Sequence, residues 1–164
     1  MEQPPTVQQL IANIQNERAD WQALIEQIDQ ERLTSPGVAG SWSVKDIIAH
    51  ITWFEREMVG LVRAHALVGS ELWNLPTDER NAAIYEEIRG LSLELVLQDS
   101  PQVHQQLLEL LPSLSDEDLT SPESFPGMPP DWQPWLIIAQ NTYQHYQQHI
   151  PDLEKWIAAS GSGQ

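Results

Sequence analysis

Apolar residues recur along most of the chain at steps of three and four positions, with polar residues between them. This spacing places the apolar side chains on one stripe of an α-helix, whereas a half-buried strand would alternate in twos. The N-terminal stripe consists of Leu10, Ile14, Trp21, Leu24 and Ile28. It predicts a helix from about Thr6 to Arg32, with Thr6 as its N-cap.

A second stripe follows a turn in the segment SPGVAG, where one proline and two glycines interrupt the first helix. Ser43 and Asp46 match a capping box in which Asp replaces the usual Glu, and they predict a helix that continues to about Val68. The face that we expect to be buried consists of Ile47, His50, Ile51, Phe54, Met58 and Leu61.

The rest of the chain is predicted to be helical except for one long connection. A short helix is expected over Thr77–Arg89, and a longer one over Ser92–Leu111, which Pro101 should kink or split. Five prolines and a glycine make residues Pro112–Asp131 an extended connection. The pattern then predicts a final helix from about Trp132 to Ala159.

Four long amphipathic helices with one extended connection predict an all-α protein, a four-helix bundle of up-down-down-up or similar order. The 164 residues show no repeat, low-complexity segment or internal boundary, so residues 1–164 are expected to form a single domain. A chain of this length can bury a core without disulfides or metal staples. The last helix should be reached through the long connection.

Charge and composition exclude several classes of partner. Twenty-four acidic residues against eight basic ones give a net charge of −16, which repels phosphate backbones and anionic lipid. We therefore expect no nucleic-acid partner and no membrane partner. The N-terminus MEQPPTVQQL is unlike a secretory leader, and no run of eighteen apolar residues occurs, so a cytoplasmic protein is expected. The absence of cysteine excludes thiolate ligands and a cysteine nucleophile.

Histidines interrupt two of the apolar stripes. The stripe of the final helix consists of Trp135, Ile138, Thr142, His145, His149, Leu153 and Trp156. Its two imidazoles, four residues apart, lie ~6 Å from each other on one face, so both can reach a single divalent cation. His50 lies on the inner stripe of the second helix. If the two helices pack together, His50, His145 and His149 form a three-histidine metal site with an open coordination position, which suits catalysis or ligand binding.

The alternative is structural, because an inward-facing histidine is more often a hydrogen-bonded core residue than a ligand. His65 shares the inner stripe of the second helix but lies ~22 Å from His50 along the axis, so it cannot bind the same ion. Asp46, one turn before His50, could accept a hydrogen bond from the imidazole nitrogen that faces away from the metal. Its capping role explains this aspartate equally well.

Three further residues are candidates for catalysis. Glu57, two turns after His50 on a similar face, could serve as a general base, although a solvated surface role is the commoner one. Tyr143 and Tyr146 flank His145, and either could donate a hydrogen bond to a substrate or stabilise an oxyanion. Pro151 follows the histidine pair and is expected to bend the final helix there.

The segments WSVKDIIAHITW and NTYQHYQQH together resemble the DinB-like four-helix-bundle superfamily, a group described as metal-dependent hydrolases. The resemblance implies that His50, His145 and His149 bind a divalent metal, commonly zinc or nickel. The residues around the histidine pair are more similar to the ClbS/DfsB branch, namely Asn141, Thr142, Tyr143 and Tyr146, with Trp156 near the end of the helix. Members of that branch resemble resistance proteins that hydrolyse a strained electrophilic ring of a toxic metabolite. For that branch the resemblance does not by itself imply a metal.

The resulting functional hypothesis is a metal-dependent hydrolase or thiol transferase that acts on a small molecule through the three-histidine site. Both reactions use an open metal position, so the sequence does not separate them. One alternative is a metal-independent ClbS-like resistance protein that hydrolyses or sequesters a small toxic electrophile. Another is a bundle whose helix faces form a homodimer, which is also compatible with either enzyme. From the surface charge, a neutral or cationic small electrophile is the expected substrate.

Overall fold

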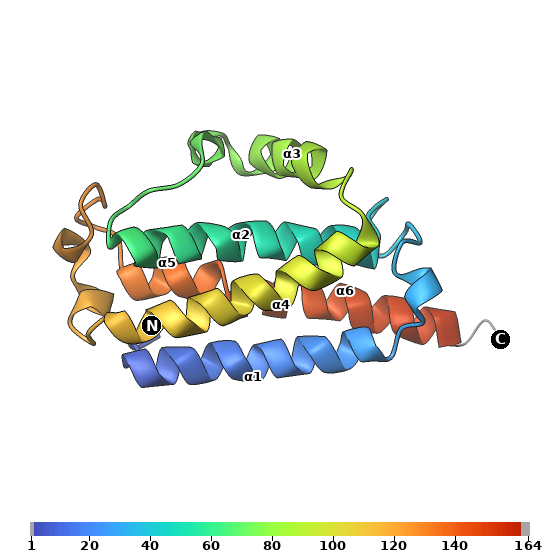
Figure 1. Ribbon diagram of the computed structural model, residues 1–164, viewed down its shortest axis with the longest axis horizontal. Helices are drawn as coiled ribbons and strands as arrows, with labels where there is room; N and C mark the ends of the chain where they lie inside the picture. Colours follow the sequence, from blue (N-terminus) through green and yellow to red (C-terminus); the bar gives the residue numbers. More distant parts are fainter. Residues whose placement is uncertain (1, 162–164) are drawn as a thin grey trace.

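Four long helical segments pack side by side in the computed structural model, which describes residues 2–161. The segments are α1 (Val7–Glu26), α2 (Val44–Ala64), α4 (Leu93–Leu110) and the pair α5 (Pro134–Gln140) and α6 (Tyr143–Gly161). Helices α2 and α4 run opposite to α1, and α5 and α6 run in the direction of α1 (Figure 1). The fold is therefore the expected all-α, up-down-down-up four-helix bundle. No strand occurs among the described residues.

The helices begin where side chains can satisfy the free N–H groups of the first turn. Thr6 and Gln9 form a capping box at α1, and Ser43 and Asp46 form another at α2, with both reciprocal hydrogen bonds present in each. Ser92 accepts a hydrogen bond from the backbone N–H of Leu95 at the start of α4. These starts confirm the caps predicted at Thr6 and Ser43.

Two helices end earlier than the apolar pattern predicts. Helix α1 stops at Glu26, and the expected continuation to Arg32 is only a 3-10 turn. Helix α2 stops at Ala64, because His65 adopts a left-handed backbone conformation with φ of 49°. The backbone N–H of Leu67 then donates to a carbonyl of the long connection instead of extending the helix to Val68. Periodicity does not detect these ends, because the apolar spacing continues past them.

Two helices of the bundle, α4 and α6, continue through an internal proline. Helix α4 is continuous through Pro101, so of the predicted kink or split, the split does not occur. Helix α6 likewise continues through Pro151. Both prolines are exposed, so each removes one backbone hydrogen bond on a face where water can satisfy the freed carbonyl.

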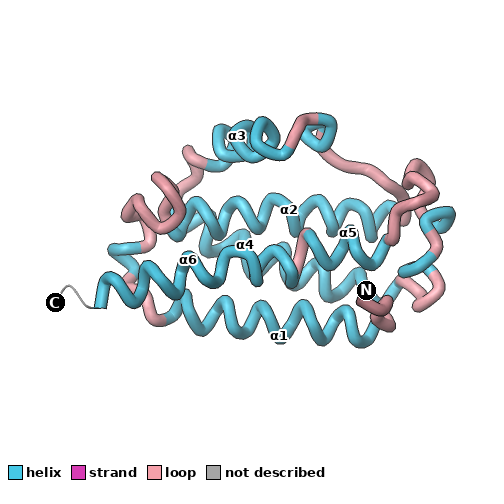
Figure 2. The backbone as a smooth tube through the Cα atoms, turned by 180° about the vertical axis from the view of Figure 1, so that it is seen from behind, coloured by secondary structure: helices cyan, strands magenta, loops and turns pink. Residues whose placement is uncertain are grey.

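The predicted final helix is two helices, α5 and α6, separated at Asn141 and Thr142 (Figure 2). The Asn141 side-chain amide donates to the carbonyl of Ile137 at 2.8 Å, and the Thr142 hydroxyl donates to the carbonyl of Ile138 at 2.6 Å. These side chains satisfy carbonyls at the end of α5. The Thr142 carbonyl then accepts the first backbone bonds of α6.

The remaining elements cover the bundle. Helix α3 (Thr77–Ile88), predicted as a short helix, lies along the outer side of α2 (Figures 1 and 2). The long connection, expected to be extended, contains 3-10 turns at Asp118–Thr120 and Pro122–Ser124, and a third at Leu111–Ser113 leads into it. None of the described helices is long and apolar enough to cross a bilayer.

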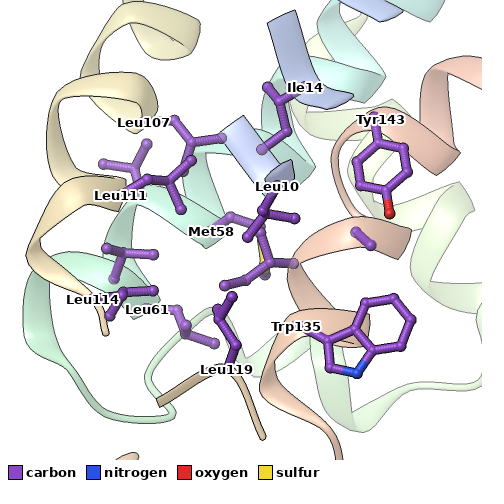
Figure 3. Packing of buried hydrophobic residues seen from close by; sticks show 14 of the residues in the cluster. Leu10, Ile14, Met58, Leu61, Leu107, Leu111, Leu114, Leu119, Trp135 and Tyr143 are labelled. Atoms are coloured by element: carbon purple, nitrogen blue, oxygen red, sulfur yellow. The ribbon is translucent and has the colours of Figure 1, made fainter. Parts of the chain in front are cut away.

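Buried apolar residues form two clusters, one towards each end of the bundle. The first cluster includes Leu10, Ile14, Met58, Leu107, Leu119, Trp135 and Tyr143 (Figure 3). The second includes Trp21, Ile47, Ile51, Phe54, Ile84, Tyr146 and Leu153. Each fully buried aliphatic or aromatic side chain contributes roughly 1.5–3 kcal/mol to folding. The buried polar side chains that could carry function lie along the second cluster.

Candidate metal centre

Three histidines from two helices meet inside the bundle. His50 of α2 and His145 of α6 are 3% and 7% exposed, and His149, one turn further along α6, is half-buried. The Nε2 atom of His145 lies 3.2 Å from Nε2 of His50 and 3.1 Å from Nε2 of His149. One ring nitrogen from each histidine lies within 4.8 Å of the others. Helices α2 and α6 therefore bring together the three histidines that the sequence analysis selected.

The arrangement of these nitrogens fits a divalent metal ion. Nitrogens that each lie ~2.1 Å from a tetrahedral zinc are separated by roughly 3.4 Å, close to the two short contacts around His145. A neutral imidazole nitrogen is either a donor or an acceptor, so Nε2 of His145 cannot make a good hydrogen bond to both neighbours at once. A cation between the rings would instead accept all three lone pairs.

Burial keeps the rings neutral. Burial, with a smaller influence of the neighbouring His149, lowers the pKa of His50 to about 3; burial, with His149 and His50, lowers the pKa of His145 to about 2. The pKa of His149 is also lowered by burial, against the opposing influence of Asp152. At neutral pH all three imidazoles therefore have a lone pair available, which is the protonation state that a metal requires.

The outer nitrogens lack the partner that metal-binding histidines usually have. Nδ1 of His50 and Nδ1 of His145 are buried without a hydrogen bond to any described residue. Asp46, a candidate for this role, instead accepts from the backbone N–H of Ser43 at 2.9 Å. The rings are held by packing, because Trp42 and Phe54 meet the His50 ring edge to face, with centroids 5.1 and 4.9 Å away.

A cavity of about 230 Å³ opens next to the histidines. Besides the three imidazoles and Phe54, its lining comes from α3 and from the region around the break between α5 and α6. The remaining lining residues are Thr77, Arg80 and Asn81 of α3, Gln140 and Asn141 at the break, and Gln148 within α6. The break that the sequence did not predict thus places polar side chains around the histidines.

None of the three predicted catalytic residues lines this cavity. Both carboxylate oxygens of Glu57 accept from the backbone N–H of Ser70, at 3.1 and 3.2 Å, so this side chain holds the loop after α2. Burial raises the pKa of Glu57. Tyr143 packs in the first apolar cluster (Figure 3), and Tyr146 is fully buried on another side of α6.

Tyr146 belongs to a second buried polar group that the sequence analysis missed. Its hydroxyl accepts from Nη1 of Arg18 at 2.8 Å and donates to the carboxylate of Glu55 through a short hydrogen bond. Glu55 is 1% exposed, and burial raises its pKa to about 7, although Arg18 and Tyr146 act in the opposite direction. Glu55 follows Ile48 and Ile51 at helical spacing, so a carboxylate on an inward stripe was the available signal.

Comparisons with known proteins agree with this fold. A search of curated proteins found no significant match. The structure is similar to DfsB, described as a sibling lethal factor precursor, with a TM-score of 0.79, 18% identity and coverage of 96% of this chain and 98% of that one. It is similar to an uncharacterised protein from Escherichia coli UTI89, with a TM-score of 0.76, 17% identity and 96% coverage of both chains.

A third similar structure is the colibactin self-resistance protein ClbS in complex with double-stranded DNA. Its TM-score is 0.74 at 17% identity, with coverage of 94% of this chain and 96% of that one. Identities this low establish a shared fold. At the level of sequence, the family model of the DinB superfamily matches residues 14–151, which is most of the chain. The chain therefore belongs to the DinB superfamily.

Proposed function

We propose that this protein is a metal-dependent enzyme for a small molecule, in which His50, His145 and His149 hold a divalent ion, zinc or nickel. The observation that supports this most strongly is the convergence of three neutral imidazole nitrogens at the base of a cavity. Membership of the DinB superfamily supports it as well. When bound, such an ion keeps an open position and acts as a Lewis acid toward an oxygen or sulfur atom.

The residues of the chain prepare the site for that role. Burial keeps the imidazoles unprotonated, and Phe54 gives the cavity an apolar wall. The side-chain amides of Asn81 and Gln148 can donate to and accept from a bound molecule, which would fix its orientation.

Hydrolysis is favoured over thiol transfer by the size of the cavity. Its volume of about 230 Å³ is below the range of roughly 300–1,000 Å³ that is usual for ligand pockets. Hydrolysis requires room for one small substrate and a water molecule. Thiol transfer requires room for the thiol and its acceptor together, so a small cavity suits it less well.

A metal-independent reaction or sequestration is the second candidate function. It is favoured by the two buried Nδ1 atoms without partners, because a metal site usually anchors these atoms. The fold likeness to ClbS and DfsB is compatible with it. Although the ClbS structure contains DNA, the net charge of −16 opposes a phosphate backbone, so the proposed ligand here is a small molecule.

Metal analysis of protein purified without an affinity tag tests the proposal. We expect about one zinc or nickel ion per chain, released by acid as the imidazoles protonate. His149→Ala should abolish binding, and the matched control His65→Ala should retain it, because His65 lies at the C-terminus of α2. Full metal content in the His149 variant would refute the site.

A screen of esters, amides and epoxides then tests the reaction class. Turnover that disappears in His145→Ala and after chelation supports metal-dependent hydrolysis. Turnover that survives both treatments supports the metal-independent alternative. Tight binding of an apolar compound to metal-free protein, without turnover, supports sequestration.

A further inference from the structure

The cavity beside the histidines is positively charged in a strongly acidic protein. Acidic residues outnumber basic ones by 24 to 8 in the chain, but no carboxylate lines the cavity. The three histidines are neutral at pH 7, because burial lowers the pKa of each. Arg80 of α3 is therefore the only lining residue with a full charge.

Arg80 is held in place without a carboxylate partner. Its Nη2 donates to the carbonyl of Leu75 at 2.9 Å, and its Nε donates to the carbonyl of Leu72 at 3.4 Å. The guanidinium carbon lies 4.9 Å from the ring centroid of Trp73, which in turn contacts the cavity residue Phe54. Salt bridges among residues 2–161 involve other basic residues, so the charge of Arg80 is not neutralised by an acidic side chain.

The start of α3 places backbone N–H groups without a side-chain cap beside the same cavity. Thr77, the first residue of α3, lines the cavity, and the preceding Pro76 provides no side-chain cap. The first-turn N–H groups of a helix carry a partial positive charge when no side chain caps them. Asp78 and Glu79 of this turn are exposed and do not line the cavity.

We propose that the cavity selects small molecules bearing a carboxylate group, with Arg80 binding the carboxylate while the rest of the molecule reaches the histidines. Nε and Nη2 of Arg80 each donate to a backbone carbonyl, so Nη1 and the second N–H of Nη2 are the donors left for the two carboxylate oxygens. As a statement about substrate, this rests on the proposed small-molecule function. Carboxylate binding itself needs no metal.

Long-range repulsion from the acidic surface does not oppose this selection. At physiological ionic strength, exposed charges are screened over about 8 Å, whereas a half-buried arginine at the cavity is screened much less. The local charge therefore outweighs the net charge for a small ligand. This reverses the expectation, based on net charge, that neutral or cationic molecules are preferred.

Ligand titrations on chelator-treated protein test the proposal without interference from carboxylate–metal bonds. Butyrate and butyramide are matched in size and differ in charge. NMR titration should show tighter binding of butyrate, and Arg80→Gln should weaken butyrate about tenfold or more while changing butyramide little. Arg80→Lys, which keeps the charge, should lose less. The control is Arg89→Gln, which alters an exposed arginine at the end of α3 that pairs with Glu86. Its affinities for butyrate and butyramide should equal those of wild type.

Equal affinities for butyrate and butyramide, or butyrate binding that is unchanged in a folded Arg80→Gln variant, would overturn the proposal. Tighter binding of inorganic phosphate than of butyrate would also overturn the carboxylate assignment. Circular dichroism checks that the variants are folded, and Arg80→Lys replaces Arg80→Gln in the comparison if the glutamine variant unfolds.

The metal measurements test a separate claim from these titrations. If Arg80 favours butyrate over butyramide but the protein binds no metal, only the metal site is refuted. If the protein binds metal but does not favour butyrate, only the role of Arg80 is refuted.

Discussion

Helices α2 and α6 bring together two buried groups of polar side chains. The groups differ in whether the donors and acceptors of their side chains complement one another. His50 meets His145, and five residues further along α2, Glu55 meets Tyr146. His145 and Tyr146 are consecutive, so they point about 100° apart and serve different groups. The histidine group contains three alike rings beside a cavity. The group around Glu55 combines an acid, a hydroxyl and a guanidinium, which complement one another as donors and acceptors.

This difference assigns a structural role to the group around Glu55 and a binding role to the three histidines. Complementary donors and acceptors satisfy one another, so the Arg18–Tyr146–Glu55 group links α1, α2 and α6 without an added ligand. Three neutral imidazoles that face one another leave lone pairs unsatisfied, which favours an added cation. The four predictions below test this distinction, from the largest expected effect to the smallest.

Ionisation of the buried Glu55 should lower its contribution to stability as pH rises above 4.5. Its pKa rises from 4.5 in the unfolded chain to about 7 in the folded one, so the native state binds the additional proton. Between these values the contribution of Glu55 to the free energy of unfolding should fall as pH rises, by roughly 3 kcal/mol in total. Urea unfolding of wild type and Glu55→Gln at several pH values isolates this contribution, because the histidines affect both proteins equally.

In metal-free protein, the contribution of the histidines to the free energy of unfolding rises with pH, opposite to that of Glu55. Their folded pKa values lie below 6.5, so their contribution is complete above that pH and is lost as pH falls toward 3. The two influences together place maximum stability near pH 6.5. A decline above this pH that persists in Glu55→Gln would show that Glu55 is not the group responsible.

Removing the hydroxyl of Tyr146 should cost about 2 kcal/mol of unfolding free energy, because Tyr146→Phe leaves the buried Glu55 carboxyl and an Arg18 N–H without this partner. Metal content should be unchanged, since the ring still packs beside α1. Thermal or urea unfolding and elemental analysis together measure the two outcomes. A loss of metal with little loss of stability would reverse the roles assigned to the two groups.

Replacing His145 by leucine should have the opposite effects to Tyr146→Phe on metal content and stability. Metal binding should disappear, whereas metal-free protein should be unchanged or more stable by up to about 1 kcal/mol. The reason is that an apolar side chain removes a buried nitrogen that has no partner. Comparing chelator-treated His145→Leu with chelator-treated wild type by urea unfolding isolates this effect. Destabilisation by several kcal/mol would indicate that the histidines serve the core instead.

The smallest effect is expected at Glu57. Glu57→Gln keeps an oxygen that can accept from Ser70, so stability should fall by only about 0.5 kcal/mol and metal content should stay the same. Urea unfolding and elemental analysis measure both. If turnover is found and this substitution lowers it more than about a hundredfold, Glu57 is the general base that its place in the sequence suggested.

Local features were predictable because neighbouring residues determine them. Helical periodicity and the caps at Thr6 and Ser43 identified the helices and their starts. Helix ends at Glu26 and Ala64 were missed, because the apolar spacing continues beyond both. The break at Asn141 was missed because it depends on side chains that bond carbonyls one turn back, and the same residue types also occur within helices.

The functional groups divide in the same way. The sequence alone determined that His145 and His149 share one face of a helix, since four residues are close to one turn. Only the tertiary structure decided that His50 meets them, that Glu55 lies against Tyr146, and that Arg80 lines the cavity. These encounters depend on how helices far apart in the chain pack, and the periodicity of a single helix carries no information about its neighbour.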